Sequence, residues 1–124
     1  MAPAGLRPAE VVRGDESTAG RFAIAKYGGP TTVIQRTATI GTTVSHLVRN
    51  NPRRVAWRAF NRSSNDIAVG FYADLTTTTG IPFPASTGVI YVDVEQEGEE
   101  VTWEVHAIST TAGSSVTVLE VIRV

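Results

Sequence analysis

The sequence predicts an all-β protein, built as an antiparallel β-sandwich or jelly roll. Residues 55–72 alternate apolar and polar side chains in two short runs, and this period of two is typical of strands with one buried face. Seven to eight such segments follow one another along the 124 residues, with turns between them. No segment has the 3.6-residue apolar repeat of an amphipathic helix. Short strands without helices favour the two-sheet architectures.

The chain begins with a segment that we expect to be extended and not packed. Residues 1–18 contain two prolines and two glycines and little apolar periodicity. They predict an N-terminal arm, followed by a sandwich domain at residues 19–124. The tripeptide at residues 13–15, Arg-Gly-Asp, matches an integrin-recognition sequence, but three residues recur by chance too often to indicate adhesion.

Three strands are expected in the first half of the chain. Residues 21–27 predict a strand closed by residues 28–30, Gly-Gly-Pro, because proline cannot donate to a β-ladder. Residues 31–40 are β-branched and largely polar, which is typical of a strand at an edge or on the surface. Residues 42–48 predict a third strand, which ends in a basic turn at residues 49–54.

Residues 55–72 predict a β-hairpin around which the other strands pack. Its polar centre, residues 61–66, favours a turn because Asn, Ser and Asp side chains hydrogen-bond their own backbone. A lone hairpin is only marginally stable in water, so other strands must cover its apolar face. Each strand has an expected inward-facing set: Val55, Trp57 and Ala59 in the first, and Ile67, Val69 and Phe71 in the second.

A long loop is expected after the hairpin, and long ordered loops often form binding surfaces. It covers residues 73–87, which are mainly Thr, Gly, Pro and Ser. Its only large apolar anchors are Leu75, Ile81 and Phe83. Residues 89–94 then predict a strand.

Two further strands are expected in the C-terminal part, after an acidic turn at residues 95–100. The clearest alternation in the chain places Val101, Trp103, Val105 and Ala107 on the inward side of one strand. In the last strand, from Val116, Val116 and Val118 face one way and Leu119 and Val121 the other. Either both faces of this strand are covered, or a bulge near Glu120 switches the phase.

The overall composition restricts the class of protein. There is no cysteine, which excludes a disulfide scaffold and a thiolate metal site. No apolar run approaches the roughly 18 residues of a membrane helix, and residues 1–10 lack the features of a signal peptide. Residues 1–62 carry a net charge of +7 and residues 63–124 a net charge of −8. These charges cancel in space if strands of the two halves interleave, and otherwise give the molecule two poles suited to docking.

The sequence offers little for catalysis or for metal binding. His46 and His106 are the only histidines, and both are interpreted as ordinary strand residues. The chain has no Gly-x-Ser-x-Gly motif, and the acidic turn at residues 95–100 lacks the spacing of a calcium loop. We therefore expect no catalytic residue, no cofactor and no metal ion, and a protein that is not an enzyme.

A basic run near the centre of the chain raises the possibility of nucleic-acid binding. Arginine interleaved with aromatic residues is what single-strand binders use. The overall pI of about 6.1 is far from the basic footprint of such proteins, so no nucleic-acid partner is expected. The run consists of Arg49, Arg53, Arg54, Arg58 and Arg62, with Trp57 and Phe60.

Five stretches in the C-terminal three-fifths of the chain share a rhythm of strands and turns. They are residues 51–55, Asn61 with residues 65–70, residues 77–82, residues 101–109 and residues 116–121. In this rhythm the chain resembles a small β-sandwich module common among virion proteins of tailed bacteriophages, particularly capsid decoration or cement proteins. Residues 1–48 lie outside the resemblance.

The resemblance implies a non-enzymatic virion protein, made in the host cytoplasm, that binds the capsid surface and stabilises the head by bridging capsid subunits. Its implied partners are the major capsid protein and further copies of itself, with a homotrimer favoured, and no membrane. We expect the shell-facing surface to include Arg7, Arg13, Arg49, Arg53 and Arg54, and self-association to use Ile81 and Phe83. The alternative is a neck, tail or spike module that binds a host receptor or glycan, for which Trp57, Tyr72 or Trp103 would be exposed.

Overall fold

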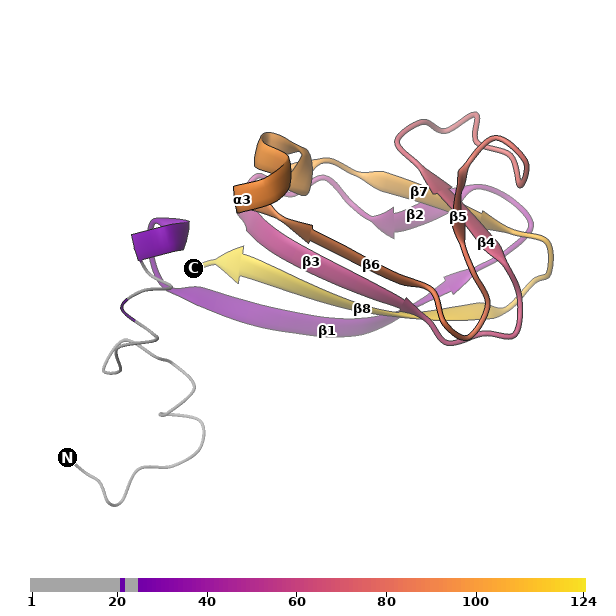
Figure 1. Cartoon of the computed structure of the whole chain (residues 1–124), viewed down its shortest axis with the longest axis horizontal. Helices are drawn as coiled ribbons and strands as arrows, with labels where there is room; N and C mark the ends of the chain where they lie inside the picture. Colours follow the sequence, from indigo (N-terminus) through magenta and orange to yellow (C-terminus); the bar gives the residue numbers. More distant parts are fainter. Residues whose placement is uncertain (1–20, 22–24) are drawn as a thin grey trace, which may run out of the picture.

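The computed structural model of the chain describes Arg21 and residues 25–124. In this part, two four-stranded antiparallel sheets pack face to face (Figure 1), which confirms the predicted all-β sandwich. Among the described residues, no helix is long and apolar enough to cross a membrane. The predicted arm at residues 1–18, with Arg7 and Arg13, lies outside the described residues.

The two sheets differ in the length of their strands. Sheet A has the order β1 (Thr31–Ile40), β8 (Ser114–Arg123), β3 (Arg54–Asn61), β6 (Val89–Asp93). Sheet B has the order β2 (Ser45–Val48), β7 (Val105–Ser109), β4 (Ile67–Gly70), β5 (Ile81–Phe83). A short helix, α3 (Val94–Glu97), and a 3-10 helix, η1 (Gly98–Thr102), connect β6 to β7. The strands of sheet A reach past those of sheet B at the end that carries α3 (Figure 1).

The core lies between the two sheets and is made of aliphatic side chains around Trp57 and Phe83. Both rings are almost completely buried, at 2% and 1% exposure. Burial of this apolar surface is the main force that holds the sheets together. The remaining core residues are Ala38, Ile40, Leu47, Val48, Ala59, Ile67, Val69, Val101, Val105, Ala107, Val116 and Val118.

The two strands predicted to pair as a hairpin at residues 55–72 do not pair with each other, so this prediction is wrong. β3 pairs with β6 and β8 in sheet A, whereas β4 pairs with β5 and β7 in sheet B. Buried Asn61 ends β3 and donates from Nδ2 to the carbonyls of Asn65 and Phe83, both at 2.9 Å. These bonds tie the connection to sheet B, so the chain crosses between sheets and does not fold back beside β3. The two strands still face one core, except that Phe71 lies beyond β4 and is 41% exposed.

The strand predicted at residues 21–27 is wrong at Arg21 and residues 25–27, because these described residues are helical. Lys26 Nζ and Tyr27 Oη both contact Asp93 Oδ2, at 3.3 and 3.0 Å. Consecutive side chains of an extended strand point to opposite faces and could not both reach one carboxylate. The shared contact with Asp93 therefore favours a helical turn.

The strand predicted at residues 101–107 begins later than expected. Val105 and Ala107 are buried in β7 as predicted, but Val101 belongs to η1 and Trp103 is 42% exposed. The acidic turn contains the short helices α3 and η1. Asp93 caps α3, because its Oδ1 accepts a 2.8 Å hydrogen bond from the backbone N–H of Glu95. The helical turn that this N-cap starts lies mostly in the predicted acidic turn, and η1 continues it to Thr102, where the alternating pattern favoured extended chain.

The last strand, β8, keeps its phase along its whole length. Val116, Val118 and Glu120 are all buried on the inner side, while Leu119 and Val121 are half-buried on the outer side. The pairing of β8 with β1 has no register shift, so the predicted bulge near Glu120 is wrong and the strand does not switch phase. The inner face of β8 is buried and its outer face is partly covered. A register shift lies instead in the neighbouring strand β3, between Arg54 and Ala56.

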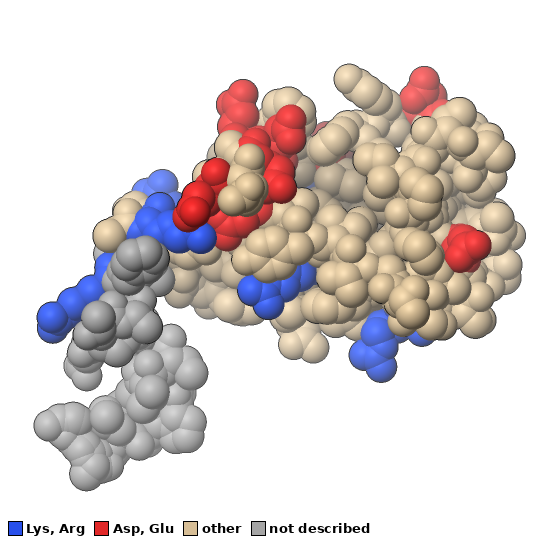
Figure 2. Space-filling model, in the orientation of Figure 1, with Lys and Arg blue, Asp and Glu red and all other residues tan. Residues whose placement is uncertain are grey.

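Strands of the basic first half and of the acidic second half interleave, which is the arrangement in which their charges cancel in space. In sheet A, β1 and β3 from the first half alternate with β8 and β6 from the second. Ion pairs join the halves, including Lys26 to Asp93 and to Glu95, both at 3.3 Å. Acidic side chains still gather over α3 and η1, with basic side chains beside them (Figure 2).

Candidate functional site

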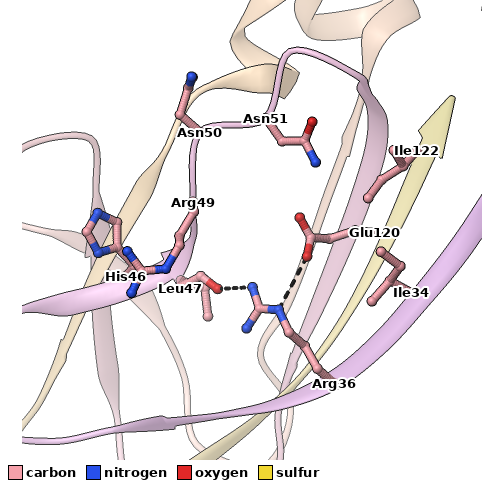
Figure 3. Close-up of a pocket in the computed structure, with 9 residues that line it drawn as sticks. All are labelled: Ile34, Arg36, His46, Leu47, Arg49, Asn50, Asn51, Glu120 and Ile122. Carbon is pink, nitrogen blue, oxygen red and sulfur yellow. Dashed lines mark hydrogen bonds and ion pairs between the residues drawn. The ribbon is translucent and has the colours of Figure 1, made fainter. Parts of the chain in front are cut away.

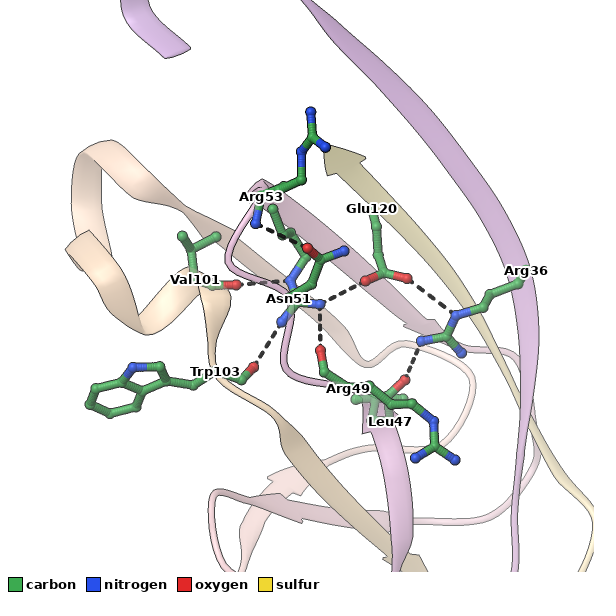
Figure 4. A network of polar contacts seen from close by, with 9 residues as sticks. Arg36, Leu47, Arg49, Asn51, Arg53, Val101, Trp103 and Glu120 are labelled. Atoms are coloured by element: carbon green, nitrogen blue, oxygen red, sulfur yellow. Dashed lines mark hydrogen bonds and ion pairs between the residues drawn. The ribbon is translucent and has the colours of Figure 1, made fainter. Parts of the chain in front are cut away.

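A network of polar contacts that includes Glu120, Val101 and Trp103 holds one end of the sandwich together (Figure 4). The donor that these residues share is a buried arginine, Arg54. The side chain of Arg54 is 0% exposed, and its Nη1 lies 2.7 Å from Oε1 of Glu120. Nη1 also donates to the carbonyl of Arg49 at 2.7 Å. Nε donates to the carbonyl of Val101 and Nη2 to that of Trp103, both at 2.8 Å. One guanidinium thus joins β3, β8, the β2–β3 connection and η1.

The local sequence explains why this arginine points inward. The register shift after Arg54 turns its side chain to the inner face, and the unbroken phase of β8 places Glu120 on that same face. Burial lowers the pKa of Arg54, and the hydrogen bond and charge of Glu120 oppose this effect. Glu120 and three carbonyls accept hydrogen bonds from four of the five N–H groups of this guanidinium.

A pocket of about 340 Å³ opens beside this network, between sheet A and the β2–β3 connection (Figure 3). Arg36 reaches from β1 to the same glutamate, with its Nε 3.3 Å from Oε2 of Glu120. Its Nη2 donates to the carbonyl of Leu47 at 2.6 Å. The pocket therefore combines cationic, amide and apolar groups. It is lined by Ile34, Arg36, His46, Leu47, Arg49, Asn50, Asn51, Glu120 and Ile122.

Both histidines and one glutamate meet on sheet B, although the sequence indicated two separate strand residues. His46 of β2 lies directly opposite His106 of β7, with ring centroids 4.7 Å apart. Oε2 of Glu104 lies 2.7 Å from Nε2 of His46 and 3.2 Å from Nε2 of His106. The hydrogen bond with His46 lowers the pKa of Glu104, and the charges of His106 and Arg49 act in the same direction. The antiparallel register, which the sequence does not reveal, creates this cluster.

Two of the predicted contact residues are not on the surface. Arg54 is committed to the buried network, and Phe83 is a core residue of β5. The prediction that they form contact surfaces is therefore wrong, because neither side chain can reach a partner. Arg49 and Arg53 are exposed, and Ile81 is 60% exposed at the edge of sheet B.

Exposed apolar side chains gather in three further places, one of which is the edge strand β6, where Val89 and Tyr91 are 59% and 52% exposed. On the edge strand β1, Val33 and Ile34 are 60% and 45% exposed. Beyond β4, Tyr72 is 77% exposed, and the rings of Phe71 and Trp103 pack edge to face at 5.8 Å. Trp57, which the glycan-binding alternative also named, is buried in the core and is not available to a ligand.

No protein-family model matches the chain, and no curated protein or solved structure matches it significantly. The function is therefore inferred from the geometry of the described residues. The sequence reasoning missed Arg36, Glu104 and Glu120 as members of polar clusters. The alternation that places Val116 and Val118 on the inner face of β8 also places Glu120 there, and this was the signal from which its burial could have been predicted.

Proposed function

We propose that this protein is a non-enzymatic structural protein of a tailed-phage virion, and that it decorates the capsid surface by binding the major capsid protein. The resemblance of residues 51–121 to decoration modules motivates the proposal. The observation that carries it in the structure is the exposed edge strand β1.

β1 has the properties of a strand that pairs with another chain. It is ten residues long, and among the described residues no strand pairs with its outer edge. Natural proteins protect such edges with prolines, bulges or inward-pointing charges. β1 has no proline, pairs with β8 without a register shift, and exposes Val33 and Ile34. Its one inward-pointing charge, Arg36, is compensated by Glu120. An edge of this kind favours strand addition by a partner protein.

The basic turn lies close enough to β1 to belong to the same contact surface. Arg49 and Ile34 line one pocket, and Arg53 is exposed four residues further along the chain. A capsid subunit that presents a strand edge next to acidic side chains would complement this surface. Ile81 is exposed on β5, the edge strand of sheet B that lies away from β2. In the proposed trimer, Ile81 contacts another copy of the protein.

The experiment compares matched substitutions on the two edges of sheet A. Val33→Lys places a charge on β1, and Val89→Lys does the same on β6, where Val89 is 59% exposed. Particles lacking the protein are incubated with each variant, and bound copies are counted by quantitative gel and cryo-microscopy. Val33→Lys and Arg53→Glu should lower the occupancy, whereas Val89→Lys should leave it unchanged. Undiminished occupancy for both Val33→Lys and Arg53→Glu would remove this surface from the proposal.

A receptor- or glycan-binding module of a tail or neck is the second candidate, and the exposed aromatic residues beyond β4 favour it. Stacking of sugars needs accessible rings next to polar groups, and Tyr72 lines a pocket of about 280 Å³ with Asp74 and Thr79. Binding on a glycan array that Tyr72→Ala and Trp103→Ala abolish would support this function. A copy number close to that of the capsid protein would support decoration.

A further inference from the structure

The cluster of His46, Glu104 and His106 has the geometry of an incomplete metal site. The ligand atoms of these three residues all lie within 4.8 Å of one another. Four ligands at zinc–ligand distances of about 2.0–2.2 Å stand roughly 3.3 Å apart in a tetrahedron. Glu104 Oε2 is already 3.2 Å from Nε2 of His106, and its 2.7 Å distance to His46 has to lengthen.

The backbone holds two of the three ligands in place. His46 and His106 are directly opposite each other in the β2–β7 pair, so both project from the same face of sheet B. Val105 and Ala107, on either side of His106, point into the core, which places both imidazoles on the outer face. The side chain of His106 is only 10% exposed, whereas those of His46 and Glu104 are 33% and 44% exposed. The two more exposed ligands can adjust to an ion, while His106 is fixed.

The chemistry of the three donors selects the class of ion. Two imidazole nitrogens and one carboxylate oxygen suit zinc and other divalent transition metals, whereas magnesium and calcium prefer oxygen ligands alone. The three residues leave a fourth position for water or for a donor from another molecule. Oε2 of Glu104 lies within 3.2 Å of Nε2 of both imidazoles, and a divalent ion would bind between these three donor atoms.

We infer that His46, Glu104 and His106 form a binding site for a divalent transition-metal ion, with Zn²⁺ as the principal candidate. The bound ion would link β2, an edge strand of four residues, to β7 at the point where a register shift interrupts their pairing. The inference does not depend on the proposed virion function, since it uses only the geometry of the three side chains.

The test measures binding of Zn²⁺ alone to the full chain without an affinity tag, after treatment with EDTA and dialysis. Equilibrium dialysis with elemental analysis should give one zinc per chain, and zinc should raise the melting temperature. Zinc should also shift the ring resonances of both histidines together in NMR spectra. Magnesium at the same concentration should not bind, should not raise the melting temperature and should not shift the histidine resonances.

The variants separate this site from adventitious binding. His46→Gln and Glu104→Gln alter partly exposed side chains and should each weaken zinc binding by more than about tenfold, since even loss of a residue that only supports a ligand costs 10–100-fold. Glu100→Gln is the matched control, because this exposed carboxylate is near in sequence but outside the cluster. Circular dichroism confirms that each variant is folded. Zinc affinity that is equal in all three variants, or absent from the unmodified chain, would overturn the inference.

Discussion

Removal of the buried guanidinium of Arg54 should destabilise the fold more than any change to a neighbouring arginine. Arg54→Met keeps much of the side-chain volume but deletes all four hydrogen bonds. It leaves Glu120 inside the protein with the longer contact to Arg36 as its remaining ion pair among the described residues. Loss of one partner of a buried ion pair costs about 3–5 kcal/mol. A domain of this size has a total stability of about 5–15 kcal/mol. Arg54→Met should therefore lose a large part of the free energy of unfolding of the domain.

The double variant Arg54→Met/Glu120→Leu tests which part of the network is responsible. Replacing a whole buried ion pair by apolar residues is often neutral. Here the carbonyl of buried Val101 would still lack its donor, and an unsatisfied buried acceptor costs about 1–3 kcal/mol. The carbonyls of Arg49 and Trp103 are partly exposed and can turn to water. The double variant should thus lose about 1–3 kcal/mol, less than Arg54→Met alone.

Urea unfolding followed by far-ultraviolet circular dichroism and by tryptophan fluorescence measures these differences. The matched control is Arg53→Met, an exposed neighbour whose substitution should change the stability by less than about 0.5 kcal/mol. A free energy of unfolding for Arg54→Met within about 1 kcal/mol of the control would refute the assigned role of the network. A double variant as stable as the unmodified protein would show that the ion pair alone matters and the carbonyls do not.

Two further substitutions test other parts of the fold. Burial would raise the pKa of Asp93, but hydrogen bonds from Glu95, Tyr27 and Lys26 outweigh it and lower the pKa. A lowered pKa contributes stability above the unfolded-state value near about 4, and this is lost as the pH falls through the folded-state pKa. Melting temperatures should therefore drop more steeply below pH 4 for the unmodified protein than for Asp93→Asn, and equal slopes would contradict this. Gly88→Ala would place Cβ 2.5 Å from the carbonyl oxygen of Pro84, so it should cost about 1–3 kcal/mol in urea unfolding. Gly41→Ala, with no atom within 4 Å of its Cβ, is the control, and equal losses in the two variants would argue against the clash.

The sequence predicted the strands better than their partners, and the reason is physical. Alternation reports which side of a strand is apolar, and Trp57, Ala59, Ile67 and Val69 all reach the core as expected. Alternation does not show which other strand of the sheet pairs with a given strand. The connection after β3 has the composition of a hairpin turn, but the side chain of Asn61 bonds to sheet B and sends the chain across the sandwich. Pairing of this kind depends on a few buried hydrogen bonds that no periodic pattern encodes.

Polar clusters were harder to predict for a related reason. Arg54 looks like its exposed neighbours Arg49 and Arg53 in the sequence, and only the register shift in β3 turns it inward. His46 and His106 are 60 residues apart, and the β2–β7 register alone makes them a pair. Composition did contain one useful signal. A basic first half and an acidic second half are compatible with one compact domain if charged partners meet across it, as Arg54 and Glu120 do.

The pairing of Arg54 with Glu120 also changes how the charges of the surface should be interpreted. Arg36, Arg54 and Lys26 have acidic partners from the second half, and so they are compensated within the domain. Arg49 and Arg53 are exposed in the turn beside the pocket, and neither has an ion-pair partner among the described residues. A net charge of −1 therefore conceals a local basic surface next to the edge of β1. A partner that binds here has to supply both a strand edge and acidic groups, which is a narrower requirement than either feature alone.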